Sequence, residues 1–548
     1  DTLRMLDSMI KNTEIEKIGF DLKSDLEILQ TANINLAGKF FDIMISAYLL
    51  NPGRKILLAD LVSENLNEEI AEENKKGQLG LEIETEEETA KKICAIADYI
   101  FKLKSIHKKE IEKISAEQIA CLPAERHGLP AGMENNNAAK NTLGEVFAQV
   151  EMPLVKILAQ MEIRGIKLNS LIFQGISETI TKRIVNLEKS IYELSGENFN
   201  IASPKQLSEV LFEKMKLSAN DLKRGKSGVI STASAELERI RGQHKIVEKI
   251  EEYRELSKLK NTYLDTLPLM VDKNSRLHTS FNQAVTATGR LSSSEPNLQN
   301  IPIRTDLGQL LRTAFVAENG WKLISADYSQ IDLRVVAHVS GDKKMIELFH
   351  KGEDIHRATA AEINKIPLSQ VTEKIRHTAK ELNFGVIYGM GTFGFAARTG
   401  ISKDDARKFI DAYFEKFQGV ANYMREIKEF AKKNGFVETE IGRRRYLPEI
   451  NSSNFQLQSM AERMAINMPI QGLAADIMKI AMINVFEEYK NNPDIKMLLQ
   501  VHDEIILEVR ENLTDEVAKK IKTILENAYP LRVPLVANVK IGDNWGEI

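Results

Sequence analysis

Cysteines are scarce in this sequence and long apolar runs are absent, and each shortage excludes a class of protein. The 548 residues include two cysteines, Cys94 and Cys121, whose spacing suits neither a zinc site nor a disulfide framework. This scarcity points to a reducing compartment. No uninterrupted apolar run approaches the ~18 residues that a membrane-spanning helix needs, and the longest lies around residues 43–50. We therefore expect no membrane association.

An excess of charge of one sign is also lacking. The formal net charge is −4, which by itself argues against a nucleic-acid partner. Residues 64–88 hold ten Glu and two Lys, so the rest of the chain is mildly positive. That balance permits a local basic groove without requiring one. Bulk charge therefore leaves the class of partner open.

Length and composition indicate a protein of two to four domains with ordinary globular composition. Apolar periodicity predicts helices over residues 151–168, 171–194 and 235–262, and a polar run predicts a linker at 135–149. Residues 286–302 form a long polar segment, which inside a domain is usually functional. The chain opens at Asp1 without a signal-peptide pattern, so we expect a truncated or processed product.

Residues 376–388 show a helical pattern with a four-residue spacing. Arg376, Lys380, Phe384 and Tyr388 drift only ~40° per step around a helix, so they share one side of it. Two cations suit a polyphosphate, and two aromatic rings suit a base or a sugar. The alternative is an amphipathic surface helix whose cations are solvated and whose rings lie in the core.

Acidic residues end two strand-like segments that flank this helix in the sequence. Residues 321–328 read as a strand with Asp327 near its end, and a helix follows. Residues 497–509 read as a hairpin whose turn carries Asp503. Carboxylates brought together there repel unless cations intervene, and two of them holding two Mg²⁺ ions ~4 Å apart make a phosphoryl-transfer site. The alternative is that both aspartates only cap turns.

Three segments carry a resemblance to a known family. Asp327–Arg334, Arg376–Gly389 and Val501–Glu504 resemble motifs A, B and C of family A DNA polymerases, of the DNA polymerase I large-fragment type. The likeness is colinear from about Val150 to the C-terminus. It extends to three further segments, 286–302, 353–357 and 466–472. Three motifs in the right order are far more specific than any one alone.

The resemblance implies a mixed α/β, right-hand polymerase fold that follows a ribonuclease-H-like domain of the 3′–5′ exonuclease type. The implied parts are an exonuclease-like domain at 1–134, the linker at 135–149, a thumb at 150–279, a first palm part at 280–345, fingers at 346–436 and a second palm part at 437–548.

The resemblance also implies a template-directed DNA polymerase that adds dNTPs to a primer 3′-hydroxyl. Its catalytic residues would be Asp327, Asp503, Glu504 and Lys380. Two Mg²⁺ ions, with Mn²⁺ as a substitute, would be held by Asp327, Asp503 and the carbonyl of Tyr328. The implied nucleotide-binding residues are Arg376, Lys380, Phe384, Tyr388, His356, Gln330 and Asp332. Those implied for primer–template DNA are Arg290, Gln299, Asn300, Arg463, Asn467, Gln471 and His502.

One departure from the family's pattern concerns Asp332. The family's DNA polymerases usually carry Glu there, where the side chain crowds the ribose 2′ position and bonds the motif B tyrosine. Aspartate keeps the charge but is one methylene shorter. We expect weaker exclusion of ribonucleotides here, by about tenfold if the pocket does not adjust.

The second departure lies in the exonuclease-like region. Residues 18–25 and 40–44 resemble its second motif, but the first, an Asp-x-Glu strand, is missing, and the Tyr-x-x-x-Asp helix expected near 92–96 does not appear. Asp25 is left without the partners that a two-metal nuclease needs. We therefore expect no proofreading.

Three alternatives stay open. They are a polymerase with substantial reverse-transcriptase or ribonucleotide-incorporating activity, a catalytically inert primer–template binding protein, and a nuclease. For the template-directed DNA polymerase we expect a monomer. It would be cytoplasmic and nucleoid-associated if the source is bacterial, and an organelle or viral origin is also open.

Overall fold

The computed structural model describes residues 8–70, 85–120, 141–220, 222–225, 228–303 and 305–548. Most of the acidic segment 64–88, the first residues of the expected linker and Cys121 lie outside these ranges. The chain forms two compact units. The larger comprises Asp1–Arg164, Thr279–Gln299 and Ile324–Ile541, and the smaller comprises Gly165–His278, Asn300–Leu323 and Gly542–Ile548.

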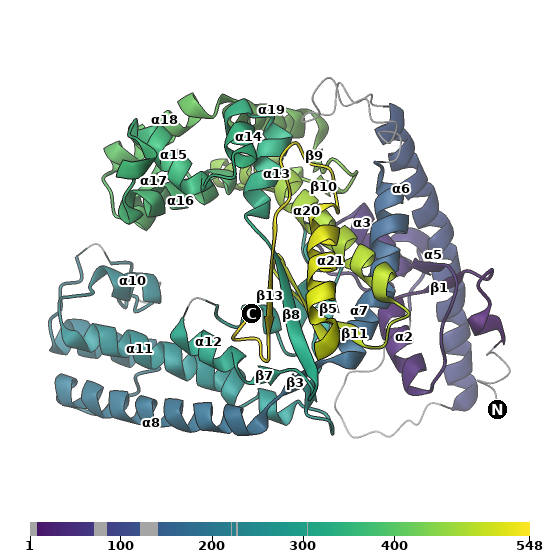
Figure 1. Ribbon diagram of the computed structural model, residues 1–548, viewed down its shortest axis with the longest axis horizontal. Coiled ribbons are helices and arrows are strands. Elements are labelled where there is room, and N and C mark those ends of the chain that lie inside the picture. The colour runs from purple at the N-terminus through teal and green to yellow at the C-terminus, as the bar shows by residue number, and fades with distance from the viewer. Residues whose placement is uncertain (1–7, 71–84, 121–140, 221, 226–227, 304) are drawn as a thin grey trace. The chain divides into compact units, whose positions relative to one another are not determined.

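A four-stranded sheet in the order β11-β12-β8-β13 runs through the larger unit (Figure 1). Its strands are β8 (Trp321–Tyr328), β11 (Ile495–Val501), β12 (Glu504–Arg510) and β13 (Ala537–Gly542). β11 and β12 pair antiparallel with Val501 opposite Glu504, which confirms the predicted hairpin. Most side chains of β8, β11 and β12 are buried, as expected for strands covered on both faces.

Helices cover this sheet and connect its strands. α7 (Met152–Arg164) packs against β11, and α21 (Thr514–Glu526) packs against β12. α13 (Ile331–Ser340) follows β8 and packs against the long helix α20 (Phe455–Tyr489) and against α19 (Gln418–Asn434). Two antiparallel two-stranded sheets complete this part: β5 (Ser280–Asn282) with β6 (Ser292–Ser294), and β9 (Phe436–Glu438) with β10 (Arg444–Tyr446).

The region between α13 and α19 is helical. Its helices are α14 (Lys343–His350), α15 (Ile355–Asn364), α16 (Glu373–Ile387), α17 (Thr392–Thr399) and α18 (Lys403–Lys416). Side-chain caps fix where two of them begin: Asp354 accepts from the amides of His356 and Arg357, and Thr372 accepts from that of Ile375. α15 and α16 pack together through small side chains, including Ala360, Ala361 and Ala379.

The N-terminal part of the larger unit pairs β1 (Lys17–Gly19) with β2 (Phe40–Asp42) in parallel. Around them lie α2 (Leu22–Thr31), α3 (Ile43–Leu50), α4 (Leu58–Leu66), α5 (Glu86–Ala120) and α6 (Leu143–Glu145). A π-helical turn over Val146–Glu151 joins α6 to α7. The expected linker is therefore helical from residue 143, and its Leu143 and Val146 are buried.

The smaller unit contains a three-stranded sheet in the order β4-β3-β7, formed by β4 (Arg276–Leu277), β3 (Ile166–Leu168) and β7 (Phe315–Val316). Its helices are α8 (Ser170–Ser195), α9 (Pro204–Ser208), α10 (Ser234–Arg239), α11 (Lys245–Leu259) and α12 (Asp306–Arg312). α8 and α11 pack along each other. The continuous helix predicted over 235–262 is wrong, because the chain leaves the helix between α10 and α11, where Gly242 has φ 86°.

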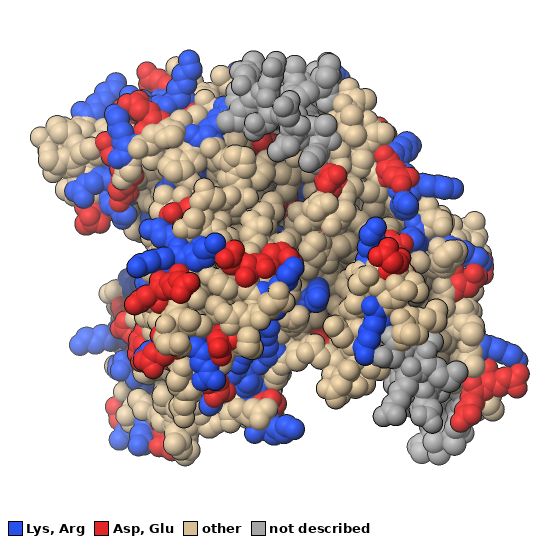
Figure 2. All heavy atoms as spheres, turned by 45° about the vertical axis from the view of Figure 1, so that its right-hand side comes forward, with Lys and Arg blue, Asp and Glu red and all other residues tan. Residues whose placement is uncertain are grey.

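Among the described residues, α20 alone is long and apolar enough to cross a membrane by length and composition. Of its most apolar window, 72% is buried inside the protein, which is typical of the core helix of a folded domain. On the face drawn in Figure 2, acidic and basic side chains are interspersed rather than separated by sign.

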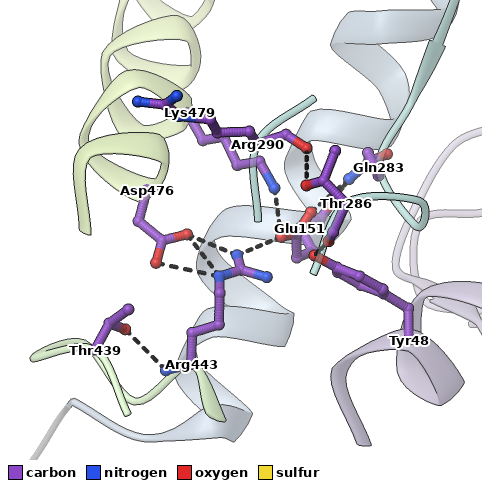
Figure 3. Close-up of polar contacts among 9 residues, drawn as sticks. All are labelled: Tyr48, Glu151, Gln283, Thr286, Arg290, Thr439, Arg443, Asp476 and Lys479. Atoms are coloured by element: carbon purple, nitrogen blue, oxygen red, sulfur yellow. Dashed lines mark hydrogen bonds and ion pairs between the residues drawn. The ribbon is translucent and has the colours of Figure 1, made fainter. Parts of the chain in front are cut away.

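Four charged side chains lie together in the core of the larger unit (Figure 3). We call Glu151, Arg443, Asp476 and Lys479 the charge cluster; each is at most 2% exposed. Arg443 donates from Nη2 to Asp476 Oδ1 at 2.6 Å and pairs with Glu151, and Lys479 Nζ donates to Glu151 Oε1 at 2.7 Å. Although burial acts to raise the pKa of Glu151, the two cations lower it to about 2. The cluster thus pairs two basic with two acidic side chains, although burial raises the pKa of Asp476 and lowers that of Lys479.

Replacing Lys479 with Met should leave the cluster one cation short. We expect Lys479→Met to lower the free energy of unfolding by about 3–5 kcal/mol, because the buried Glu151 carboxylate loses a partner. Urea denaturation measures the change. The control is Lys490→Met at the end of the same helix, where Lys490 is half exposed beside Glu487 and the expected loss is below ~1 kcal/mol. Equal losses in the two variants would contradict the stabilising role of Lys479.

Candidate active site

Acidic side chains meet at one end of the four-stranded sheet. Asp327 is the last residue but one of β8, as predicted, and Asp503 lies in the turn between β11 and β12. The amide of Tyr328 donates to the carbonyl of Asp503 at 3.0 Å, which joins the strand end to the turn. His502 has φ 53°, so the turn is a tight one that passes through the left-handed region.

Burial and like charges raise the pKa values of both aspartates. The pKa of Asp327 rises to about 7 through burial and the nearby charges of Glu504 and Asp503, against a weaker opposing effect of Lys540. That of Asp503 rises to about 6 through burial and Asp332, opposed by Arg290. Without metal, the two carboxylates are therefore more easily protonated than usual, and a bound cation would relieve the repulsion between their charged forms.

The donor groups at this position suit a hard divalent cation. Carboxylate and carbonyl oxygens are the ligands that Mg²⁺ prefers, and Mg²⁺ usually keeps waters and substrate phosphates as further ligands. The hydroxyl of Tyr328 is occupied, because it donates to the Leu525 carbonyl at 2.7 Å, so the main-chain carbonyl of Tyr328 is its expected ligand. In the part of the chain that the structure describes, no three His, Cys, Asp or Glu side chains gather closely enough to hold a metal ion. An ion at Asp327 and Asp503 would therefore need ligands beyond side chains.

Asp332 connects the acidic end of the sheet to helix α16. It is 7% exposed and lies in the first turn of α13, which follows Gln330 at φ 56°. Arg290 Nη2 lies 2.9 and 3.1 Å from its two carboxylate oxygens, and the Tyr388 hydroxyl donates to Oδ2 at 3.0 Å. The hydrogen bond from Tyr388 fixes its position beside Asp332, and those from Arg290 hold the Asp332 carboxylate.

Helix α16 presents the predicted row of side chains. Arg376, Lys380, Phe384 and Tyr388 are each partly exposed, whereas Leu382 and Val386 and other residues on its opposite side are buried. This pattern confirms the helix, and the aromatic rings do not lie wholly in the core. Arg376 pairs with Asp354 at 2.8 Å, so its guanidinium is already held toward a negative group.

His356 occupies a buried position behind this row. It is 3% exposed, its Nδ1 lies 3.0 Å from the Asn383 amide nitrogen, and its ring centroid lies 5.6 Å from that of Phe384. Its pKa is lowered to about 4 by burial and by the charges of Lys380 and Arg376, although Asp354 opposes them. His356 is therefore neutral near pH 7 and would contact a phosphate by a hydrogen bond rather than by charge.

Gln500 contacts two of the predicted site residues, and the sequence analysis did not single it out. Gln299, 9% exposed, donates from Nε2 to the Gln500 carbonyl at 3.2 Å and to Gln500 Oε1 at 3.0 Å. Gln500 in turn donates to the carbonyl of His502. Gln299 is thereby tied to the turn that carries Asp503. The available signal was one polar residue inside the apolar run 497–501 of β11.

Three predicted DNA contacts lie four residues apart on α20, at Arg463, Asn467 and Gln471. Arg463 is exposed and donates to Ser459 Oγ at 2.9 Å, and Asn467 Oδ1 is shielded from solvent without a hydrogen-bond partner among the described residues. A Cβ at Gly389, just after α16, would lie 2.7 Å from Arg463 Cγ, so this row begins beside the end of α16. Asn300 is exposed and belongs to the smaller unit.

Comparisons with known proteins agree on one family. A model described as "DNA polymerase family A" matches residues 170–547, and one described as "3'-5' exonuclease" matches residues 1–93. The "DNA polymerase I, thermostable" of Thermus caldophilus is 46% identical over 75% of this chain and 50% of its own length. The "DNA polymerase I" of Pseudomonas aeruginosa is 39% identical over 100% of this chain and 58% of its own length. The chain thus spans about half the length of the curated relatives it matches.

A solved structure extends the match to the fold. The POL domain of Pol1 from M. smegmatis, in complex with DNA primer-template and dNTP, superposes with a TM-score of 0.87 at 34% identity. The match covers 100% of this chain and 88% of that one. The mixed α/β, right-hand fold expected from the sequence is therefore confirmed, whereas the exact domain boundaries and the roles of single site residues stay predictions.

The raised pKa of Asp327 predicts how stability changes with pH. Because its charged form is disfavoured in the folded state, its contribution to stability is full below pH ~4 and is lost as the pH rises through about 7. Without metal, Asp327→Asn should therefore match the parent near pH 4 and exceed it by on the order of 1–3 kcal/mol at pH 8. Thermal denaturation in EDTA at both pH values measures this.

The control for this prediction is Asp494→Asn, at the opposite end of the same hairpin, where Asp494 is partly exposed and paired with Arg510. We expect a change below ~1 kcal/mol there at either pH. Added Mg²⁺ should raise the melting temperature of the parent and of the control more than that of Asp327→Asn, because a ligand that binds only the folded state stabilises it. A parent more stable than Asp327→Asn in EDTA at pH 8 would contradict the prediction.

Proposed function

Because this chain belongs to DNA polymerase family A, we propose that it extends the 3′ end of a DNA primer on a DNA template, using dNTPs and releasing pyrophosphate. The observation that carries the proposal is the position of Asp332. Its carboxylate accepts hydrogen bonds from Arg290 and Tyr388, and its charge helps to raise the pKa of Asp503. The end of helix α16 and the acidic end of the sheet therefore face one site. A nucleotide bound there would lie between the metal ligands and the cationic helix.

Asp327, Asp503 and the main-chain carbonyl of Tyr328 would hold two Mg²⁺ ions, with Mn²⁺ as a substitute. Such a pair of ions supplies activation of the attacking 3′-hydroxyl and neutralises charge on the leaving pyrophosphate. Glu504, held by the hydroxyl of Ser325, would keep further negative charge at the edge of the site. Gln330, one residue before α13, would lie beside the nucleotide.

Helix α16 would bind and orient the incoming nucleotide. Arg376 would exchange its Asp354 partner for the triphosphate, and the neutral His356 would donate a hydrogen bond to it. Lys380 would contact the phosphates and is the candidate proton donor to the leaving pyrophosphate. Phe384 would contact the sugar, and Tyr388 would stack near the template base.

Primer–template DNA would be bound by polar side chains around the turn of the hairpin and along α20. Arg290, Gln299, Gln471 and His502 would read minor-groove acceptors, which are similar in all correct base pairs. Arg463, Asn467 and Asn300 would contact the strands themselves. We propose that the enzyme is a monomer. The bacterial origin of the relatives named above supports a place in the cytoplasm, associated with the nucleoid.

The N-terminal domain would not proofread. It matches a 3′–5′ exonuclease model, so its ancestry is clear. However, the Tyr-x-x-x-Asp helix expected near residues 92–96 does not appear in the sequence, so Asp25 lacks a partner that a two-metal nuclease needs. We propose that this domain supports the polymerase without removing nucleotides.

Extension of an end-labelled primer with Mg²⁺ and dNTPs tests the proposed function. We expect extension by the parent and a loss on the order of 10³-fold in Asp503→Asn, since a metal ligand supplies several kcal/mol to the transition state. Asp494→Asn, at the other end of the hairpin, should retain activity. Shortening of the primer without nucleotides would show a nuclease. Binding of primer–template without extension by the parent would show an inert binding protein.

A second candidate function, the use of ribonucleotides, follows from the short side chain of Asp332. We expect Asp332→Glu to raise the preference for dNTPs over rNTPs by about tenfold, because the added methylene narrows the space near the 2′-hydroxyl. The ratio of kcat/KM values for the two nucleotides measures it. Asp332→Asn separates charge from length, since it keeps the length but weakens the pairing with Arg290. Equal discrimination by the parent and Asp332→Glu would contradict the role of the missing methylene.

A further inference from the structure

The segment from Gln283 to Arg290 is attached to the charge cluster at its first residue. Gln283 Nε2 donates to Glu151 Oε2 at 2.7 Å and to the Glu151 carbonyl at 3.1 Å (Figure 3). The hydroxyl of Tyr48, from α3, donates to the carbonyl of Thr286 at 2.7 Å, and Thr286 Oγ1 donates to the carbonyl of Arg290 at 2.5 Å. Side-chain hydrogen bonds therefore hold the segment at Gln283, Thr286 and Arg290.

Arg443 supports the same segment from the core side. A Cβ at Gly289 would lie 2.7 Å from Arg443 Nε and 3.0 Å from its Cζ, so the guanidinium packs directly on the backbone before Arg290. Gly289 has φ 86°, which glycine adopts without strain. Ion pairs also hold the guanidinium, because Nε lies 3.1 and 3.2 Å from the Asp476 carboxylate oxygens and Nη2 bonds both Asp476 and Glu151.

Arg290 transmits this position to the nucleotide site. Its backbone rests on Arg443 through Gly289, and its side chain bonds both carboxylate oxygens of Asp332. Asp332 in turn accepts from the hydroxyl of Tyr388. A displacement at Gly289 therefore reaches Asp332 and Tyr388 through two contacts.

We propose that Arg443 is a positioning residue for nucleotide selection, acting through Gly289 and Arg290 on Asp332 and Tyr388. The proposal rests on the polymerase function proposed above. A buried ion cluster adds little net stability over a well-packed apolar core, but its hydrogen bonds are directional. The cluster thus sets an orientation that apolar packing alone would not fix.

Arg443→Lys tests the proposal, because lysine keeps the charge but cannot bond Asp476 and Glu151 in a fork while covering Gly289. We expect kcat/KM for dNTPs to fall on the order of tenfold to a hundredfold, since small misplacements at a reacting centre are costly. The dNTP/rNTP preference should fall with it. The dissociation constant for primer–template should change less than about twofold, because DNA affinity comes mainly from contacts to the phosphate backbone.

The matched control is Arg444→Lys in the next position of the chain. Arg444 is also buried, at 5% exposed, but it pairs with Glu438 at 2.8 Å and lies over the ring of Phe436. We expect this variant to lose thermal stability while keeping the dNTP/rNTP preference. The proposal is overturned if both variants change the preference equally, or if Arg443→Lys leaves it unchanged.

A second variant covers the case in which Arg443→Lys does not fold. Gly289→Ala leaves every charge of the cluster in place but puts a methyl group against the Arg443 guanidinium. We expect the same fall in dNTP/rNTP preference as for Arg443→Lys. An unchanged preference in folded Gly289→Ala would overturn the proposal.

An activity-independent measurement separates this proposal from the proposed function. In denaturant unfolding, Arg443→Lys combined with Asp332→Asn should destabilise less than the sum of the two single changes, because coupled residues are not additive. Additive losses would overturn the proposal even in an active polymerase. If the parent extends no primer, the polymerase function fails, and with it the role in nucleotide selection, while non-additive losses would still show that Arg443 supports Asp332.

Discussion

Asp327, Asp503 and Glu504 gather negative charge at one end of a largely buried sheet, and the repulsion among them determines what else the site must contain. The cations that act on the two aspartates are Lys540 and Arg290, and neither offsets burial enough to keep the pKa values normal. Such a site favours a proton or a divalent cation. The fold holds the acids together by main-chain pairing, through the Tyr328 amide and the Asp503 carbonyl, so their separation does not depend on their charge state.

Two arginines of the site are already paired before any ligand arrives. Arg290 bonds Asp332, and Arg376 bonds Asp354. Pre-paired guanidinium groups keep their orientation, because a fork held by a carboxylate loses little further freedom when a phosphate replaces that carboxylate. The two pairs differ in burial: Asp332 is buried and also bonds Tyr388, whereas Asp354 is exposed. Exchange of partner is therefore easier at Arg376 than at Arg290, which suits a phosphate contact at one and a fixed support at the other.

Features of the site that depend on local sequence could be predicted, and those that depend on distant residues could not. The row from Arg376 to Tyr388, the strand ending near Asp327 and the hairpin around Asp503 each follow from the period of a short segment. The predicted helix over 151–168 ends early, because Gly165 at φ 58° turns the chain into β3. Glu151 meets Arg443 and Lys479 across 292 and 328 residues, and no periodicity links positions that far apart. Gln500 was missed because one polar residue in an apolar strand indicates no particular partner.

The charge cluster shows why residues remote from the chemistry can still be polar. Its members come from the π-helical turn before α7, from the hairpin of β9 and β10, and from α20, and apolar side chains would join these elements equally well. Apolar contact is non-directional, however, and tolerates small shifts of one element against another. Arg443 instead bonds the carboxylates of Asp476 and Glu151, and its guanidinium also lies against the backbone at Gly289, so these contacts restrict its orientation. Arg290 follows Gly289 and bonds Asp332, so a fixed Arg443 guanidinium also fixes the position of the Asp332 carboxylate. The charged core of this protein therefore determines geometry more than stability.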